Sequence, residues 1–576
     1  MQGMKAMPMK HILLLLASAL CASAVLEASA QPLKARPVAK KYIACGFEFG
    51  GSVTASNLLD HAEKYENIGI DGTVLDIRAP MPDGKVASTY MTVRDMRPWP
   101  VDLFAGEVGY LNRLTSSTTF RELFIRSFRA PRNRIDWLDD NVWTIIAGHM
   151  RAIAWAAKRG GCRGLHIDHE DYFAAKQFIR QKAEIPWEEL AEVARRRGRE
   201  VFKPVFDEFP EAVMFFYRFM VADPGFWNYY ATATDPVAAM KAKGDLWIPF
   251  MNGLLDVMPW TAKVVEGDET GYRYESKYNW FHFARNLQRN CAQRLVDESN
   301  LDKFRARTST SFPVYLDAYT DDSYTPDKEY YRGPVEGSRA IHLERKLAQA
   351  TEASDEYVWL FCEKRSWIRW EKKPDGRMVD DARTWPEMFI GIGDVLKANK
   401  DPGKFMAECL KDRGKYEDVF NDSLYSHWRR KDKRPGTFAM DSAVGDGDNS
   451  SYRATGVESG CFQCSVPAKC GEYFLIEFSV KNAGGDWCRA NIASNEKDLL
   501  GWLIPGYAIT LGEPNADGWR KGTAFVRVPD FGKAVSFTAG FSLAEGESAY
   551  IDNVHFYKVI PLLKDGFAPA AGKTAK

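Results

Sequence analysis

Short apolar runs alternate with longer amphipathic segments over roughly the first 400 residues of the chain. Helical periodicity of apolar positions lies between most of the runs, and its clearest instance is a stretch that Asp140 or Asn141 would cap and Gly160-Gly161 would end. Eight runs have the length and content of buried strands, and they lie at residues 42–49, 72–78, 123–128, 163–168, 212–219, 262–268, 312–319 and 357–363. Strands that alternate with helices predict a parallel sheet covered by helices.

Eight such units over roughly 360 residues predict an α/β fold, the (β/α)8 TIM barrel, for residues 41–402. An open, doubly wound sheet is the alternative architecture for the same pattern. No GxGxxG or GxxxxGK sequence, which would be typical of a nucleotide-binding sheet, follows any of the eight runs. The barrel is therefore the expected fold, and no nucleotide cofactor is expected.

The pattern changes near residue 400. Beyond it, turns rich in Gly, Pro and Asp separate short segments in which apolar and polar residues alternate. This pattern predicts an all-β jelly-roll sandwich over residues 415–558. Residues 561–576 are small and polar, as is typical of a disordered tail.

The first 30 residues have the pattern of a secretory signal peptide. Basic residues precede a long apolar run, and the small-x-small end is Ala28-Ser29-Ala30. A membrane anchor would need about 20 clean apolar residues, but Glu27 interrupts this run. We expect a secreted or periplasmic protein whose mature chain has no membrane span.

The charge balance and the cysteines indicate which binding partners, metal sites and disulfides to expect. Lys+Arg and Asp+Glu balance at 77 each, so no broad basic field is expected to bind nucleic acid or anionic lipid. The cysteines show no pair of zinc-finger type. Four of them lie in or beside apolar runs and are expected to be buried thiols, namely Cys45, Cys162, Cys291 and Cys362. Four others cluster where one disulfide is plausible, namely Cys461, Cys464, Cys470 and Cys488.

Acidic residues lie at or just beyond the ends of six predicted strands. They are Glu48, Asp76, Asp168 with Glu170, Asp268 with Glu269, Asp317 and Glu363. In a (β/α)8 barrel the carboxyl ends of all strands meet at one face, where catalytic side chains lie. We therefore expect these carboxylates to line one acidic cleft.

Paired carboxylates in unequal environments can separate into a proton donor and a nucleophile or base, as glycosidic cleavage requires. Aromatic rings near the same strand ends offer flat apolar faces for sugars, and acids, Arg and His can bond hydroxyls. The expected substrate-binding residues are Glu48, Arg78, His166, Tyr172, Tyr217, Tyr272, Asp317, Trp359 and Glu363. The sequence thus predicts a glycoside hydrolase acting on a poly- or oligosaccharide.

The fourth strand supplies the expected catalytic acid. Asp168 and Glu170 lie two residues apart, so both should project toward the same side, and neighbouring carboxylates raise one of their pKa values. We predict that Glu170 is catalytic and Asp168 supports it, with Asp268 or Glu269 across the barrel as partner. In the alternative, Asp168 pairs with Arg163 or another arginine beneath the cleft.

The stretch "GLHIDHEDY" resembles the strand of family 18, chitinase-type glycoside hydrolases, which reads roughly D-G-x-D-x-D-x-E. Asp168 and Glu170 match the last two acids, whereas Arg163 and His166 stand at the first two. More broadly, "WLDDNVW", "GLHIDHEDY", "VVEGDETGYRY" and "YVWLFCEKRSW" resemble large secreted bacterial barrels of glycoside hydrolase type that carry a β-sandwich.

In the α-galactosidase-type clan of such barrels the nucleophile follows strand four and the acid/base follows strand six. The resemblance then implies that Glu170 or Asp168 faces Asp268 or Glu269, while the clan with its nucleophile after strand seven would bring in Asp317. The second region resembles carbohydrate-binding modules through "VPAKCGEYF" and "YIDNVHF". This implies either sugar binding or a domain that only braces the barrel, and its candidate stacking residues are Trp487, Trp502, Tyr507 and Trp519.

Three other functions fit the same residues. The first is a non-catalytic glycan-binding protein, and the second is substrate-assisted, chitinase-like hydrolysis. The third is a metal-dependent hydrolase or lyase, since His166, Asp168 and Glu170 share one face of a strand. No HExxH or HxH sequence occurs, so no metal is expected, and no GxSxG supports a serine nucleophile.

Overall fold

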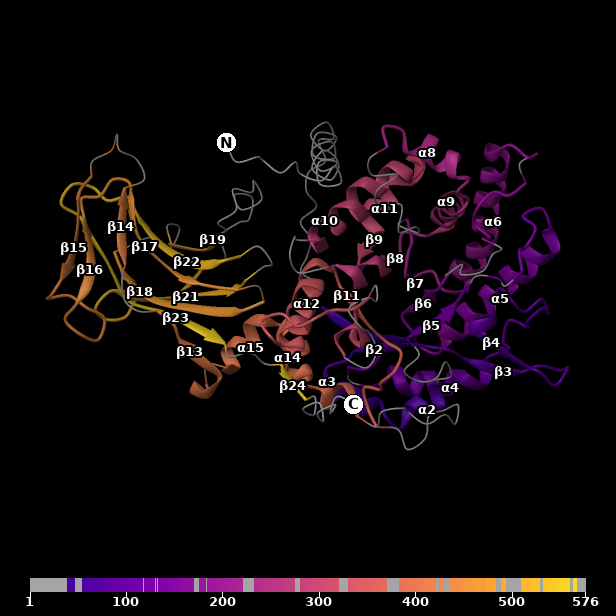
Figure 1. Ribbon diagram of the computed structural model, residues 1–576, viewed down its shortest axis with the longest axis horizontal. Helices are drawn as coiled ribbons and strands as arrows, with labels where there is room; N and C mark the ends of the chain where they lie inside the picture. The colour runs from indigo at the N-terminus through magenta and orange to yellow at the C-terminus, as the bar shows by residue number, and fades with distance from the viewer. Residues whose placement is uncertain are drawn as a thin grey trace, which may run out of the picture.

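The computed structural model describes residues 39–46, 54–117, 119–129, 131, 133–169, 176–182, 184–220, 233–274, 280–320, 330–369, 383–409, 411–420, 424–428, 433, 435–469, 471–482, 488–493, 509–528, 532–559 and 563–566. The predicted signal peptide lies outside these ranges, as do Glu48, Glu170 and Tyr172 and all of the predicted tail except residues 563–566. Figure 1 shows a helix-covered sheet in indigo to magenta and an all-β region in orange to yellow. None of the helices within the described ranges has the length and apolar content to cross a bilayer.

The first region is a (β/α)8 barrel, as predicted. Its parallel strands follow the order β10-β11-β1-β2-β5-β6-β7-β8-β9. Every predicted run overlaps one of them. The strands are β1 (Lys41–Gly46), β2 (Gly72–Leu75), β5 (Phe124–Ser127), β6 (Gly164–Ile167), β7 (Val213–Phe216), β8 (Lys263–Glu266), β9 (Thr308–Thr310), β10 (Phe312–Tyr315) and β11 (Tyr357–Cys362).

The seventh strand closes the barrel because it pairs with both of its neighbours. β9 pairs with β8 and β10 pairs with β11, and only Ser311 separates β9 from β10. The Ser311 amide donates to the Glu266 carbonyl at 2.7 Å, which continues the pairing across the break. Strands of a closed barrel are tilted and staggered, so one segment can pair with one neighbour first and with the other later. For this reason the strand begins at residue 308, four residues before the predicted run.

The connecting helices lie on the outside of the barrel. The longest predicted helix is α5 (Asp140–Arg159), and its N-cap is Asp139 rather than Asp140 or Asn141, because the Asp139 carboxylate accepts from the Asn141 and Val142 amides. The others are α2 (Ala55–Leu59), α3 (Ala62–Ile68), α4 (Ala105–Thr115), α6 (Trp187–Glu208), α8 (Pro236–Lys243), α9 (Trp247–Val257), α10 (Trp280–Asn286), α11 (Leu301–Arg307), α12 (Arg339–Ala353), α13 (Trp385–Met388), α14 (Ile392–Lys400) and α15 (Pro402–Cys409). A short hairpin of β3 (Arg78–Pro80) and β4 (Val86–Ser88) follows β2.

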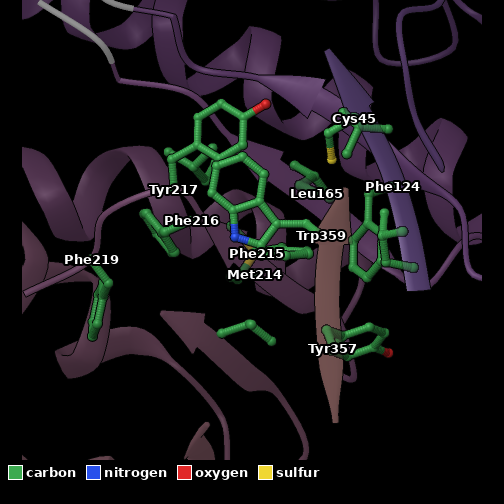
Figure 2. Close-up of a cluster of buried hydrophobic side chains, with 14 of the residues drawn as sticks. Cys45, Phe124, Leu165, Met214, Phe215, Phe216, Tyr217, Phe219, Tyr357 and Trp359 are labelled. Carbon is green, nitrogen blue, oxygen red and sulfur yellow. The ribbon is translucent and has the colours of Figure 1, made fainter. Parts of the chain in front are cut away.

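Aromatic side chains fill the barrel interior (Figure 2). The Phe124 ring meets Phe215 and Tyr357 edge to face at 5.4 and 5.5 Å between centroids. One level higher, the Tyr217 and Trp359 rings stack at 4.5 Å. These side chains come from β5, from β7 and its end, and from β11, so they join opposite walls into one core.

A cluster of charged residues closes the amino ends of the strands, and we call it the amino-end cluster. Glu122, just before β5, binds Lys41 at 3.1 Å and Arg163 at 2.9 Å, and it accepts a hydrogen bond from the Tyr357 hydroxyl at 3.0 Å. Glu356 binds Lys41 at 2.8 Å and also binds Lys263. Five strands are tied together at this end.

The second region is the predicted β-sandwich. One sheet has the order β15-β16-β23-β18-β21-β20 with β13 beside β23, and the other has the order β14-β17-β22-β19. Their facing side chains form a separate apolar core. The strands are β13 (Tyr416–Asp418), β14 (Tyr425–Trp428), β15 (Thr437–Asp441), β16 (Ser451–Thr455), β17 (Gly460–Pro467), β18 (Tyr473–Lys481), β19 (Cys488–Ala493), β20 (Ile509–Leu511), β21 (Trp519–Arg527), β22 (Ala534–Phe541) and β23 (Ser548–Val559).

The cysteines of both regions carry free, buried thiols wherever they are described. This confirms the prediction for Cys45, Cys162, Cys291 and Cys362. The plausible disulfide is not formed among Cys461, Cys464 and Cys488, because each of these thiols is free, and Cys470 lies outside the described residues. Strand packing rather than a cross-link holds these three cysteines in place.

The sandwich is docked on the barrel through helices α12 and α14, which lie between the two regions in Figure 1. Arg527 of β21 donates to the Ala348 carbonyl and pairs with Glu352 at 2.6 Å, both on α12. Tyr473 of β18 donates to Asn399 on α14. After the sandwich, β24 (Lys564–Asp565) pairs with β12 (Phe389–Ile390) of the first region.

Candidate active site

Carboxylates gather at the carboxyl ends of the barrel strands, as the sequence predicts. We call this group the C-terminal rim, and in the described residues it consists of Asp76 after β2, Asp168 after β6, Asp268 and Glu269 after β8, Asp317 after β10 and Glu363 after β11. Glu48 and Glu170 belong to the same predicted set but lie outside the described residues. The environments of the described carboxylates differ strongly.

Arg126 of β5 points into the barrel between two of these carboxylates. Its Nε lies 4.0 Å from Asp76, and both side chains are about 5% exposed. Burial alone would lower the pKa of Arg126, but Asp76, Tyr217 and Asp168 outweigh it and the pKa rises. Burial raises the pKa of Asp76, and Arg126 opposes that rise. Arg126 therefore fits the alternative in which an arginine beneath the cleft accompanies Asp168.

Arg163, the other arginine proposed for that role, lies at the opposite end of the barrel, where it binds Glu122. Sequence reasoning missed Arg126 altogether. The feature that could have indicated it is the single arginine within the apolar run "LFIRSF". A charge inside a buried strand needs a partner, and such a residue therefore indicates a carboxylate nearby.

His166 lies on β6 inside the barrel, one level below Asp168. Its ring meets the Tyr217 ring edge to face at 4.2 Å, and neither ring nitrogen has a hydrogen-bond partner within the described ranges. Burial, and then the charge of Arg126, lower its pKa well below the usual value, so the imidazole is neutral. His169 points away, as predicted from strand alternation, and stacks on Trp247 at 3.8 Å.

Asp268 is the most specifically held carboxylate of the rim. It is fully buried in a left-handed conformation at φ 43°, at the start of a 3-10 turn over Glu269–Arg273. The Tyr274 hydroxyl donates to Asp268 Oδ2 at 2.6 Å. Burial raises the pKa of Asp268 to about 6, although the Tyr274 hydrogen bond and the Arg218 charge act in the opposite direction.

Glu269, the other predicted partner, has a different role. It forms an ion pair with Arg218, which follows β7, at 2.6 Å. The two side chains are 11% and 21% exposed. Of the two candidates after strand six, Asp268 has the raised pKa and Glu269 has the neighbouring cation.

Asp317 and Glu363 meet where β10 and β11 end. The Glu363 amide donates to Asp317 Oδ2 at 2.7 Å, and the Tyr315 hydroxyl donates to Glu363 Oε2 at 3.0 Å. Burial raises the pKa of Asp317 to about 6, and the negative charge of Glu363 adds to the rise. Asp317 thus joins Asp76 and Asp268 as a rim carboxyl with a raised pKa.

Three predicted sugar-stacking aromatics are buried among other rings. Tyr217, Tyr272 and Trp359 are 4%, 5% and 0% exposed. Trp359 stacks on Tyr217 and donates from its indole nitrogen to the Gly267 carbonyl at 2.7 Å. Tyr272 packs on Trp359 at 5.3 Å, so protein rings occupy these faces. Arg78 is exposed on the β3–β4 hairpin.

Trp519, the described member of the four candidate stacking residues of the sandwich, is 2% exposed, while Trp487, Trp502 and Tyr507 lie outside the described residues. Within the part of the chain that the structure describes, no group of three His, Cys, Asp or Glu side chains has the geometry to hold a metal ion.

A comparison with protein-family models finds no match, and neither does a comparison with curated protein sequences. Solved structures show distant likeness. An α-amylase from Geobacillus thermoleovorans, complexed with acarbose, is 10% identical, with 87% of this chain and 98% of that chain covered and a TM-score of 0.33. An endo-1,4-β-mannanase from Rhizomucor miehei is 10% identical, with 65% and 97% covered and a TM-score of 0.34.

The enzymatically active domain of tailspike protein 4 from bacteriophage CBA120 is 14% identical, with 24% of this chain covered and a TM-score of 0.18. This chain spans only 19% of that protein's chain. Likenesses at this level carry no argument about activity. The assignment of the barrel rests on its own strand order and closure.

Proposed function

We propose that the protein is an exported glycoside hydrolase that cleaves a poly- or oligosaccharide at the C-terminal rim of its barrel. The observation that supports this best is Asp268, a buried carboxyl with a raised pKa of about 6 on the same rim as Asp168. Glycosidic cleavage needs one carboxyl that donates a proton and a second that attacks or activates water. Carboxylates in unlike environments at one strand-end face meet that requirement.

The roles follow from these environments. With a pKa of about 6, Asp268 keeps its proton under mildly acidic conditions and would give it to the leaving glycosidic oxygen, because a catalytic acid works best when its pKa lies near the working pH. Glu170, supported by Asp168, would act from two strands away as nucleophile or base. Arg126 holds a positive charge beneath Asp168 and would keep this side of the site from becoming a purely anionic cluster.

Substitution of Asp268 by Asn tests the proposal. Asp268→Asn keeps the shape and can still accept from Tyr274, but it has no proton to donate, so we expect turnover to fall by roughly 10²-fold or more. The matched control is Asp302→Asn, because Asp302 is 88% exposed on α11, far from any strand end of the rim. Reducing-end assays on a panel of neutral and acidic glycans measure the change.

Several outcomes would count against the proposal. Normal turnover of Asp268→Asn would exclude Asp268 as the acid. Glycan binding without turnover by the unsubstituted protein would favour a glycan-binding protein instead. Unsaturated products from uronic-acid polymers would indicate a lyase.

A further inference from the structure

Lys346 is a buried lysine that neither the predicted site nor the fold accounts for. It lies on α12, outside the barrel wall, and it is 1% exposed. Its ammonium group donates to the Gly271 carbonyl at 2.8 Å and also to the Tyr274 carbonyl. The same group lies 4.6 Å from the centroid of the Phe281 ring and 5.7 Å from that of Tyr274.

Burying an ammonium group costs several kcal/mol before any partner is considered. Two carbonyl oxygens and two aromatic faces offset part of that cost, since cations bind both. Both carbonyls belong to the turn after β8. The charge of Lys346 is therefore directed at one short, irregular segment.

That segment has few hydrogen bonds of its own. Within it, the Gly271 amide donates to the Asp268 carbonyl at 2.8 Å and the Tyr274 amide donates to the Gly271 carbonyl at 3.2 Å. Gly271 is also in close contact with β10, because a Cβ atom there would lie 2.6 Å from Pro313. The turn is thus placed by its surroundings. Arg332 donates to its backbone at the Tyr272 carbonyl at 2.9 Å, and Lys346 binds its backbone at two points.

The turn carries Asp268 at its start and Tyr274 at its end, and Tyr274 holds Asp268 through the 2.6 Å hydrogen bond. We propose that Lys346 is a positioning residue, which orients the Asp268 carboxyl by fixing the backbone of the turn at Gly271 and Tyr274. This inference rests on the proposed role of Asp268. The groups that act on Asp268 are Tyr274 and Thr270 from the turn, Arg218 from the end of β7 and Gln288 from the helical segment Leu287–Cys291.

The test compares Lys346→Met with Lys303→Met in the full-length protein. Lys303, on α11, also donates to a backbone carbonyl, that of Leu255 at 2.6 Å, but its partner is away from the rim. We expect Lys346→Met to speed amide hydrogen exchange in residues 269–274 and to lower kcat about 10-fold with little change in KM. Lys303→Met should change neither the amide hydrogen exchange of residues 269–274 nor kcat. Lys346→Arg keeps N–H donors, so its kcat should be higher than that of Lys346→Met.

The pH profile supplies a readout that a purely structural role would not move. If Tyr274 shifts, Asp268 loses a hydrogen bond that favours its ionised form, so its pKa should rise. The alkaline limb of kcat, where the acid must stay protonated, should then move to higher pH in Lys346→Met.

Unchanged exchange in residues 269–274, or faster exchange with kcat and its pH profile intact, would overturn the inference. Should Lys346→Met fail to fold, Lys346→Gln, which keeps a donor group, is subject to the same criteria. If the unsubstituted protein hydrolyses no glycan, the proposed function fails, while hydrogen exchange still shows whether Lys346 fixes the turn.

Discussion

Buried carboxyl groups at the two ends of the barrel have different environments, and the pKa of Glu356 shifts in the opposite direction to those of Asp268 and Asp317. In the amino-end cluster, Glu122 and Glu356 are each bound by two cations. Burial alone would raise the pKa of Glu356, but Lys263 and Lys41 outweigh it and the pKa falls. At the C-terminal rim, burial raises the pKa of Asp268 and of Asp317 to about 6.

This difference indicates that the charges at the amino ends contribute to stability, whereas the carboxyls of the C-terminal rim are suited to chemistry. Paired charges at the amino ends hold the strands together, in line with the general division of labour between the two faces of such barrels. Carboxyls whose pKa is raised to about 6 cost folding free energy at neutral pH, because their ionised forms are poorly solvated. A fold retains such groups where they have another use, and strongly shifted carboxyls therefore indicate a functional site.

The largest effect is expected at the amino ends. Glu122→Ala removes the 3%-exposed carboxylate that Lys41, Arg163 and Tyr357 bind, so we expect the free energy of unfolding to fall by about 3 kcal/mol or more. Chemical denaturation measures the loss. Turnover should stay normal in the folded fraction, and a loss below about 1 kcal/mol would show that the cluster contributes little.

At the rim, the matching substitution should affect turnover rather than folding. Glu170→Gln preserves size but removes the titrating proton, and we expect turnover to fall by roughly 10²-fold or more, with glycan affinity and thermal stability retained. Near-normal turnover in correctly folded Glu170→Gln would exclude Glu170 as the catalytic carboxyl. Collapse of folding in Asp168→Asn alone would assign that neighbour to the barrel core together with Arg126.

Asp317→Asn should stabilise the protein, and only above a definite pH. The folded pKa is about 6 against an ordinary value of 3.8, so between these pH values the folded chain keeps a proton that the unfolded chain has lost. Stability due to this group therefore falls as pH rises from about 4 to about 6, and the cost persists above that window. We expect Asn to add about 3 kcal/mol at pH 8 and almost nothing at pH 3.5, as measured by denaturation at both pH values. An equal effect at the two pH values would contradict this account.

The smallest effect is expected from Arg163→Gln. Arg163 is 43% exposed, and Glu122 keeps Lys41 and Tyr357 when it is gone. Partly exposed pairs contribute little, so we expect a loss of about 1 kcal/mol or less by denaturation. A loss as large as that of Glu122→Ala would mean that the cluster depends on this one arginine.

The barrel could be predicted because buried parallel strands leave a strong local signal. The run 357–363 is apolar on both faces up to Cys362, and the chain order of the eight runs is also their order around the barrel. The split of the seventh strand could not be predicted in this way. It depends on the stagger of the closed sheet, which is a property of all strands together.

The rim was predictable in position but not in environment. Strand ends place Asp268 and Asp317 at one face, yet their pKa shifts depend on burial by residues distant in sequence. The burial of Trp359 is likewise invisible in the sequence, since an aromatic residue near a strand end fits a sugar platform and a core equally well. Lys346 left no signal at all, because a lysine in an amphipathic helix normally reaches solvent.

The pairing of β24 with β12 has a consequence for how the molecule is made. Residues 564 and 565 leave the ribosome about 170 residues after β12, which takes roughly 10 to 30 seconds at ordinary rates of synthesis. For part of that time the nascent barrel also lacks the partners of α12 and α14, because Tyr473 and Arg527 are synthesised between β12 and β24. The surface around β12 can therefore be covered only after the whole sandwich has been synthesised, so this contact forms many seconds after the barrel strands have emerged.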